Sequence, residues 1–546
     1  MPKRRLQLLT LGAALAASMG LALAADEHAQ RIEERLPESA KPSDTAAPAN
    51  DADIEVTYAT FAPFVLKSIA VDGLASIPVA EAEACAAPYV GETVGPIELT
   101  SLTQCITQKY RSRGLFLSRA IVPPQQVSDG ILKIRAIEGY VAAINPKGID
   151  QAEADAQFAA TLTERPAQLA TFERALLLLA DRYGHRITAS QLVADPGDPA
   201  RYAFNLAVDV DPFAWRLYGD NRGTEAHGPE QAYAWVAWNA LFGAPDRLAV
   251  SLFTTPTDTS ELVYGDITYS RGWGQGILWS EIGASLSRSR EADTDQSNDV
   301  DRVFGRLTVP LLRSREQSLW AGLAFDARDT KEPALPAPTV DESTRVLRGS
   351  LSYTLVEGAT RIDLALEGAQ GFDALGASKN GAPRLTRSDA RPQFSKVRLD
   401  AAVAHKFLGD WEVAVAGAAQ LADGSLVSSE EFGVGGPRFG RAYDYSEIVG
   451  DHALAGMAEV RWNWRDAFGP RTNLQLYAFA DAASIWNTGR VPVVDEADLS
   501  SAGAGLRLVF WPGNMLALEA AKPLSGGPRA TGDSDPRFFL TLTLGW

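Results

Sequence analysis

The sequence has very little cysteine, methionine or histidine: 2, 4 and 5 residues in a chain of 546. The histidines are scattered, and neither a G-x-S-x-G nor an H-E-x-x-H motif occurs, which argues against hydrolase chemistry. A G-x-x-x-x-G-K-[ST] loop for nucleotide phosphates is also lacking. Basic residues are too few to balance the acidic ones, and the net charge of −17 argues against a nucleic-acid partner. We therefore expect neither an enzyme nor a cofactor or metal site.

Long apolar runs are lacking as well, except for one at the N-terminus. The basic residues 3–5 precede about 20 mostly apolar residues, and Ala22 and Ala24 stand before an acidic pair. This pattern predicts a secretory signal peptide over residues 1–25. The alternative is an uncleaved anchor helix, because the run is long enough to cross a membrane. No later stretch reaches 18 uninterrupted apolar residues, so we expect no second membrane helix.

The two cysteines, Cys85 and Cys105, belong to a chain that is expected to leave the cytoplasm. In an oxidising compartment such a pair favours a disulfide. The alternative is two buried free thiols, and the sequence does not exclude it.

Two small α/β modules are predicted after a linker-like segment, residues 26–60. Within that segment, residues 28–38 could form a short polar helix. In residues 61–140 the patterns predict a strand, two helices and two strands, and Ser101 followed by Gln104 predicts that the second helix begins there. Residues 141–211 predict a strand, a polar connection, a helix and two strands.

Residues 212–546 have no helical pattern, and apolar and polar residues alternate instead, as in RIDLALEGA (361–369) and KVRLDAAVAH (396–405). A soluble sandwich of so many strands would expose paired edges. A closed transmembrane barrel has no edge, and it turns one apolar file toward lipid. At about 21 residues per strand and connection, the segment accommodates about 16 antiparallel strands. The final FFLTLTLGW then closes the barrel, with Trp546 at a membrane interface.

A resemblance to a known family begins in the first module. The stretch RAIVPPQQVSDGILKIRAIEGYV (119–141) resembles the end of the first POTRA domain of two-partner secretion transporters, the haemolysin/haemagglutinin secretion proteins. Its most specific parts are the Pro123-Pro124-Gln125 step and the Glu138-Gly139 pair. The resemblance implies that these five residues belong to a client-binding POTRA motif. LYGDNRGTEAHG (217–228) is similar to the family's first barrel strand and turn.

The strongest resemblance is that of SSEEFGVGGPRFGRAYDYSEIVGDHALAGMAEVRW (428–462) to the long loop that folds back into the barrel lumen in this family. We expect that lumenal loop near residues 432–460. Its tip motif comprises Gly440, Arg441, Ala442 and Tyr443. Ala442 replaces the usual glycine, which puts the tightness of the turn in question.

The family's partner motif on a lumenal strand, Phe-x-Asp-x-Gly, appears as Phe479, Asp481 and Ala483, again with alanine for glycine. The other file of this strand is apolar, so the carboxylate of Asp481 should face the lumen. An arginine inside a barrel needs a carboxylate, preferably through a two-pronged hydrogen bond. We therefore predict an ion pair between Arg441 and Asp481. The alternative is that Arg441 caps a mobile loop in solvent.

The resemblance implies a monomeric outer-membrane pore, in contact with outer-membrane lipid and with its POTRA domains in the periplasm. Such a pore recognises an unfolded partner, a large β-helical adhesin or haemolysin, and secretes it without nucleotide hydrolysis. The client could add a strand to a POTRA sheet edge, and residues 28–38 would plug the resting barrel. The alternative is an assembly factor that inserts other barrel proteins into the membrane, although such factors usually carry more POTRA domains. A passive porin would not explain the periplasmic modules.

Overall fold

The computed structural model describes residues 62–127, 129–224, 227–243, 245–290, 297–333, 339–489, 496–511, 513–529 and 531–545. They divide into two compact units, one ending at Asp211 and the other beginning at Pro212. The predicted signal peptide, the predicted plug at 28–38 and Trp546 lie outside the described residues. Within these ranges, no helix is both long enough and apolar enough to cross a membrane.

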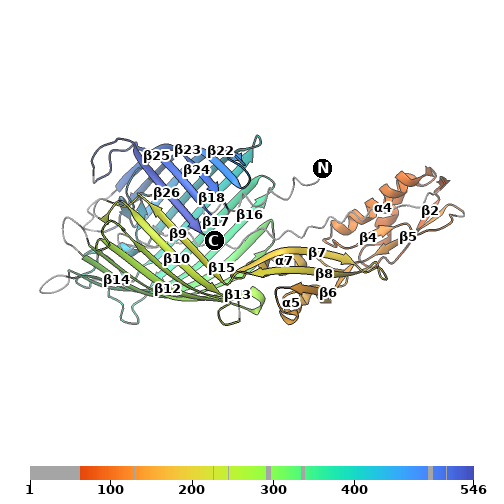
Figure 1. The fold of residues 1–546 in the computed structure, drawn as a ribbon, viewed down its shortest axis with the longest axis horizontal. Helices are drawn as coiled ribbons and strands as arrows, with labels where there is room; N and C mark the ends of the chain where they lie inside the picture. The colour runs from red at the N-terminus through yellow and green to blue at the C-terminus, as the bar shows by residue number, and fades with distance from the viewer. Residues whose placement is uncertain are drawn as a thin grey trace. The chain divides into compact units, whose positions relative to one another are not determined.

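The first module contains a three-stranded sheet in the order β2-β5-β4, with β2 and β5 parallel (Figure 1). Its elements are β1 (Phe64–Val65), β2 (Ser68–Asp72), α3 (Val79–Ala86), η3 (Ala87–Tyr89), β3 (Thr93–Val94), α4 (Pro96–Arg111), β4 (Arg119–Ile121) and β5 (Ile131–Ile137). The apolar stripe of α4 packs against the sheet, and Leu99, Ile106 and Leu132 are fully buried. The three-stranded sheet and the two α-helices follow the predicted strand–helix–helix–strand–strand order, whereas the short pair β1–β3 and the turn η3 were not predicted.

Helix α4 begins at Pro96, so the predicted start at Ser101 is wrong. Proline is favoured in the first turn, where its missing N–H is not needed. The Glu98 carboxylate accepts the Gly95 N–H at 2.8 Å, which satisfies one free donor at this helix end. Ser101 lies inside the helix, and its hydroxyl donates to the Ile97 carbonyl at 3.1 Å.

A disulfide joins Cys85 in α3 to Cys105 in α4, with Cα atoms 5.9 Å apart. It closes a loop of 20 residues, so it restricts the unfolded chain. Replacing both cysteines by serine should lower the free energy of unfolding of this module by about 3 kcal/mol. Pulse proteolysis of the full-length protein in urea, read at cleavage sites within residues 64–139, measures the shift. Reduction of the unmodified protein should shift the midpoint equally, and an unchanged midpoint in both samples would contradict the prediction.

The second module has the sheet order β6-β8-β7 and a core of aromatic rings. Its elements are β6 (Tyr140–Lys147), α5 (Gln151–Gln157), α6 (Ala159–Thr163), α7 (Leu169–Ala180), β7 (His185–Ala194) and β8 (Arg201–Val210). The sequence patterns predict only a polar connection where α5 and α6 lie. Phe158, between these two short helices, is fully buried, and its ring centroid lies 5.4 Å from that of Phe204. Burial of one aromatic side chain therefore holds a segment whose overall composition is polar.

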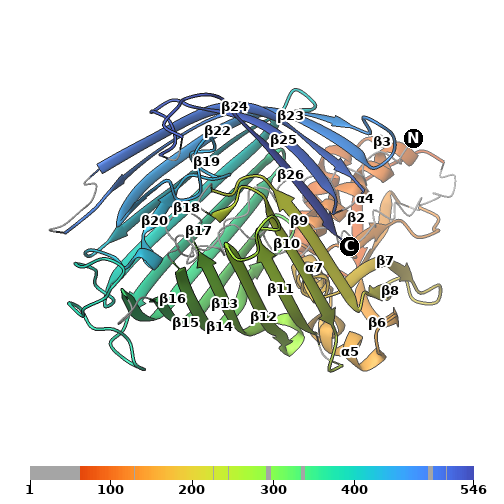
Figure 2. The same cartoon turned by 60° about the vertical axis from the view of Figure 1, so that its left-hand side comes forward.

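The second unit is a closed barrel of sixteen strands, each antiparallel to its neighbours, and the predicted fold class is confirmed (Figure 1). Figure 2 shows β9 beside β26, where the first strand meets the last. The strands are β9 (Phe213–Asp220), β10 (Gln231–Asn239), β11 (Asp246–Thr254), β12 (Leu262–Trp273), β13 (Leu278–Arg290), β14 (Ser297–Arg313), β15 (Gln317–Glu332), β16 (Val340–Glu357), β17 (Thr360–Gly371), β18 (Ser395–Phe407), β19 (Trp411–Ala422), β22 (His452–Arg465), β23 (Thr472–Trp486), β24 (Glu496–Phe510), β25 (Met515–Pro523) and β26 (Arg537–Gly545).

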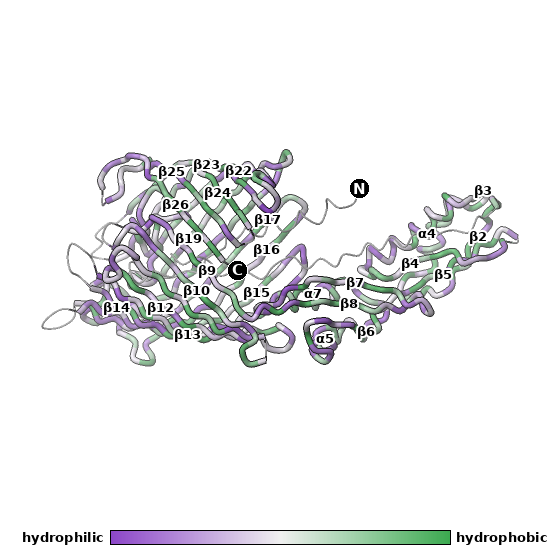
Figure 3. Tube along the Cα trace, in the orientation of Figure 1, coloured by the Kyte–Doolittle hydropathy of each residue, from purple (hydrophilic) through white to green (hydrophobic). Residues whose placement is uncertain are grey.

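Apolar and polar residues alternate along the barrel strands (Figure 3). The exposed file is largely apolar, whereas the buried file holds most of the charged residues of the strands, together with some apolar ones. Along β23, Asn473, Gln475 and Asp481 are buried, whereas Leu476 is exposed. Because a strand turns successive side chains to opposite faces, the exposed file suits lipid and the buried file lines the lumen.

The two ends of the barrel differ in the length of their connections. Short turns such as residues 358–359 lie at the end where β9 starts, and long connections such as 372–394 and 423–451 lie at the opposite end. Phe242, in a short turn, is exposed. An exposed aromatic residue in such a turn suits the interfacial girdle of a membrane barrel.

Candidate functional site

The connection between β19 and β22 runs through the lumen. It contains η6 (Ser428–Glu430) and a hairpin of β20 (Phe432–Val434) with β21 (Ile448–Gly450). Arg438 pairs with Asp400 of β18 at 2.6 Å, while other loop residues contact β16, β23 and β25. A buried segment that reaches strands so far apart around a closed wall must lie inside it. The loop spans residues 423–451, so the end of the range 432–460 belongs to wall strand β22.

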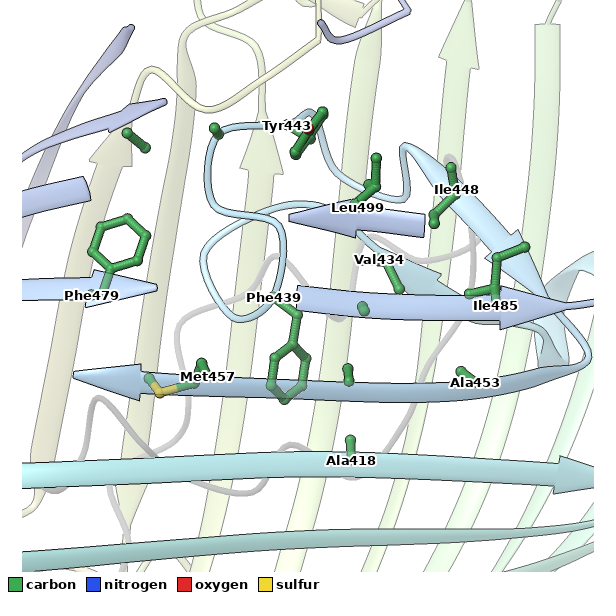
Figure 4. Packing of buried hydrophobic residues seen from close by; sticks show 14 of the residues in the cluster. Ala418, Val434, Phe439, Tyr443, Ile448, Ala453, Met457, Phe479, Ile485 and Leu499 are labelled. Atoms are coloured by element: carbon green, nitrogen blue, oxygen red, sulfur yellow. The ribbon is translucent and has the colours of Figure 1, made fainter. Parts of the chain in front are cut away.

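An apolar cluster fixes the loop to one side of the lumen (Figure 4). The loop contributes Val434, Phe439, Tyr443 and Ile448, all of them buried. The wall contributes small residues where the loop approaches, together with a few larger ones: Ala418, Ala453, Ala455, Met457, Phe479, Ala483, Ile485 and Leu499. Alanine on the wall leaves room for the aromatic residues of the loop, and this burial stabilises the docked position.

The loop tip is a tight turn from Gly440 to Tyr443. The Tyr443 N–H donates to the Gly440 carbonyl at 2.9 Å. Only Gly440 has a positive φ, +74°, in this turn, whereas Arg441 and Ala442 do not. Alanine at 442 therefore requires no left-handed backbone, and it does not loosen the turn. Its side chain is fully buried.

The predicted ion pair between Arg441 and Asp481 is wrong in its detail, although the two residues do meet. Asp481 accepts the backbone N–H groups of Gly440, at 2.9 Å, and of Arg441, at 3.4 Å. Its carboxylate also accepts the Ser501 hydroxyl at 2.7 Å. Asp481 thus holds the backbone of the tip, because buried amides left without an acceptor would cost about 1–3 kcal/mol each.

The Arg441 side chain has two glutamates as partners. Its Nη1 lies 2.8 Å from Glu459 Oε2 on β22 and 3.3 Å from Glu519 Oε2 on β25. The guanidinium also stacks 4.2 Å above the ring of Phe479. The sequence analysis did not identify either glutamate as a partner of Arg441. The alternation that directs the Asp481 side chain into the lumen also directs those of Glu459 and Glu519 there, so the sequence contained a signal for both.

A second polar cluster joins three of the long connections and is here called the Asp451 junction. The buried Asp451 carboxylate accepts the Leu426 N–H at 2.7 Å, the Thr488 N–H at 2.8 Å and Arg387 Nη1 at 2.9 Å. Arg387 belongs to the connection 372–394. Three connections that are distant in sequence are thus tied to one carboxylate at the end of the barrel opposite the start of β9.

In the structure, the residues of the predicted POTRA motif contact other residues of the same module. Gln125 pairs with the backbone of Lys133, donating at 2.6 Å and accepting at 2.9 Å. Glu138 accepts the N–H groups of Ala75 and Ser76 at 2.9 and 2.7 Å. These contacts fix two connections to the sheet.

The remaining members of the motif are Gly139, Pro123 and Pro124. A Cβ at Gly139 would lie 2.5 Å from the Leu117 carbonyl oxygen, so only glycine fits there. Pro123 is half-buried and Pro124 is exposed. Contact of the motif with a client stays a prediction.

The hydrogen bonds to Glu138 make the first module sensitive to acid. Partial burial raises the pKa of this carboxyl, but the hydrogen bonds from Ala75, Ser76 and Tyr110 outweigh it and lower the pKa below the ordinary 4.5. A lowered folded pKa stabilises the module above pH 4.5, and this contribution disappears as the pH falls through the lower folded value. Glu138→Gln should therefore lower the unfolding midpoint at pH 7, and the difference should shrink toward pH 3–4. Pulse proteolysis at both pH values measures it, and a constant difference would contradict the assignment.

A closed membrane barrel of sixteen strands, with a loop folded into its lumen and two α/β modules before it, defines an outer-membrane barrel of the POTRA-bearing class. The family model for haemolysin secretion/activation proteins of the ShlB/FhaC/HecB type matches residues 207–508. The model for the ShlB-type POTRA domain matches residues 64–139. The chain belongs to the haemolysin secretion/activation protein family, and it is an outer-membrane protein with its POTRA domains in the periplasm.

The proteins that are similar to this chain match it either in sequence over part of their length or in fold alone. The outer membrane transporter CdiB of Escherichia coli is 27% identical over 227 residues, which cover 41% of this chain and 37% of that protein. The chain thus spans less than half the length of this curated relative. The solved CdiB structure from Escherichia coli matches with a TM-score of 0.69 at 18% identity, over 93% of this chain and 94% of that one. BamA of Haemophilus ducreyi lacking POTRA domains 1–3 matches with a TM-score of 0.53 at 13% identity, over 89% and 100%. At 18% and 13% identity, the two structural matches show that the fold is shared, and no more.

Proposed function

We propose that this protein is a pore that recognises an unfolded exoprotein in the periplasm and secretes it through the barrel without nucleotide hydrolysis. The client is a large β-helical protein, an adhesin or a haemolysin. The observation that carries the proposal is the folded-back loop, because Asp481, Arg441 and the apolar cluster hold a removable segment inside a membrane-spanning wall. A passive pore would not need the periplasmic modules that precede the barrel.

The POTRA modules offer edges where a client could bind. The sheet orders place β2 and β4 at the edges of the first sheet, and β6 and β7 at the edges of the second. An extended chain can add to such an edge through backbone hydrogen bonds, with little demand on its sequence. Val193 on β7 is exposed and would lie beside an added strand. This geometry supports capture of an unfolded polypeptide better than capture of a folded one.

Passage through the pore requires the loop to leave its docked position. Much of the contact between loop and wall is polar, through carboxylates, arginines and backbone amides. Water or the polar backbone of a passing client can replace such contacts, since a hydrogen bond contributes only about 0.5–1.5 kcal/mol net between neutral groups and about 1.5–3 kcal/mol to a charged group. The client's folding outside the cell would draw the chain forward.

The proposal predicts a large open reading frame for a secreted repeat protein beside the one that encodes this chain, and the test is secretion of that exoprotein. Cells that express both proteins should release the exoprotein, whereas cells without the barrel should retain it in the periplasm. The control is the level of other outer-membrane proteins during depletion. If those proteins are lost and no client accumulates, the chain is an assembly factor and the proposal is refuted.

A further inference from the structure

The barrel closes through an incomplete seam between its first and last strands. Strand β26 pairs with β9 only where Thr541–Gly545 meet Arg216–Asp220, among the described residues. On its other side, β26 pairs with β25 as far back as Arg537. By comparison, β15 and β16 pair along the whole of Gln317–Glu332. About half of β26 therefore has a backbone partner on one side only.

A side chain continues the ladder where the backbone pairing stops. Asn221 follows the last residue of β9, and its Nδ2 donates to the Phe538 carbonyl at 3.0 Å. Its Oδ1 accepts the Leu540 N–H at 2.8 Å. One amide side chain thus satisfies the donor and the acceptor that a longer β9 would have satisfied.

Beyond Asn221, the two sides of the seam are joined through the tip of the lumenal loop. Arg222, on the β9 side, donates to the Arg441 carbonyl at 3.3 Å. Arg537, on β26, donates to the Ala442 carbonyl at 3.1 Å and to Asp444 Oδ1 at 2.6 Å. Consecutive backbone carbonyls of one turn therefore accept from arginines on opposite sides of the seam.

The ring of Phe539 and the carboxylate of Glu519 complete this arrangement. The Arg222 and Arg537 guanidinium groups lie 3.8 and 5.3 Å from the Phe539 ring centroid. Glu519 Oε1 pairs with Arg222 at 2.7 Å, and Oε2 of the same carboxylate pairs with Arg441. Each group is buried or half-buried, so the surrounding water weakens these contacts little.

We propose that the loop tip is a clasp that holds the seam closed, with Arg222 and Arg537 as its two positioning residues. When the tip withdraws from the wall, Arg222 and Arg537 lose the Arg441 and Ala442 carbonyls as acceptors. The part of the seam without backbone pairing is then joined only by the Asn221 side chain. Loop position and seam closure are therefore coupled. The inference concerns the barrel alone and requires no client, so it can fail while the proposed function holds.

Hydrogen exchange of the full-length protein in lipid nanodiscs tests the coupling. In a variant carrying Arg222→Gln and Arg537→Gln, the amides of Thr541–Gly545 and Arg216–Asp220 should exchange at least about tenfold faster than in the unmodified protein. The amides of β15 and β16 should not change. Arg361→Gln is the matched control, because this lumenal arginine pairs with Asp363 on its own strand and lies away from the seam.

Two results would overturn the clasp. One is unchanged exchange at the seam in a folded double variant, and the other is faster exchange in all strands alike. Heat-modifiable mobility in gels identifies the folded barrel. Should the double variant fail to insert, the two single variants are measured in the same way, and the same results decide. Asn221→Ala should accelerate only the Phe538–Leu540 end of the seam, and no local acceleration there would also contradict the proposed ladder.

Discussion

Secretion through a barrel that carries Arg441→Ala should fall by about 100-fold, although the barrel remains folded in the outer membrane. The substitution removes the contacts of one guanidinium with Glu459 and Glu519 and its stacking on Phe479. Loss of one partner from a buried ionic cluster costs about 3–5 kcal/mol. The lower figure applies here, because other arginines still compensate both glutamates. We expect secretion to need the loop both docked, in the resting barrel, and released, during passage, so a barrel whose tip no longer docks should fail to secrete the client.

The measurement is the amount of client outside the cell relative to the amount retained in the periplasm. Arg441→Lys keeps a charge but lacks the planar fork, so it should restore secretion only in part. Arg361→Ala serves as the control for removal of a lumenal arginine away from the tip, and it should secrete normally. Undiminished secretion by Arg441→Ala, in cells with normal amounts of folded barrel, would remove the loop from the mechanism.

The fold was predictable because its strongest signal is local. Lipid on one side of a strand and a polar lumen on the other impose a period of two, which can be read within ten residues. The same period directs Asp481 to the lumen without knowledge of the rest of the barrel. Short helices are different, because α5 and α6 depend on burial of Phe158 among residues from other elements. No periodicity within so few residues reveals that packing.

The partner of Arg441 could not be predicted because it depends on where a long loop docks. The alternation of residues along the strands places the carboxylates of Glu459, Asp481 and Glu519 on the lumenal face. Nothing in the sequence around them shows which of the three pairs with Arg441. The structure decides through the turn at Gly440, which presents its backbone amides to Asp481 and leaves the guanidinium to the glutamates. Likewise, the expectation that alanine at 442 could loosen the turn came from the family pattern. The φ angles show that, within this turn, Gly440 alone needs the left-handed region.

The second large effect is expected at the Asp451 junction, where Asp451→Asn should open the cell-surface end of the barrel. The short turns lie at the end where β9 starts after the periplasmic modules, so the long connections face the cell exterior. Asparagine replaces one acceptor oxygen by a donor: in the place of Oδ1 the new NH2 faces the Leu426 N–H and the Arg387 guanidinium, and in the place of Oδ2 it faces the Thr488 N–H. A buried donor that faces another donor, together with loss of the ion pair to Arg387, should cost about 3 kcal/mol, the lower end of the usual range, because Arg387 keeps Glu431 and Asp389 as partners.

That cost is comparable with the free energy that the hydrogen bonds to Asp451 contribute. The three connections should therefore be separated from one another for much of the time. Planar-bilayer recordings should show a higher and noisier conductance, and protease added to intact cells should cleave within residues 372–394. Asp423→Asn is the matched control: this exposed aspartate lies in the same loop and accepts the Ser395 N–H at 3.0 Å. If both variants conduct alike, the junction does not hold the surface closed. A difference confined to Asp451→Asn would mean that the buried carboxylate, rather than loop length or crowding, keeps the connections together.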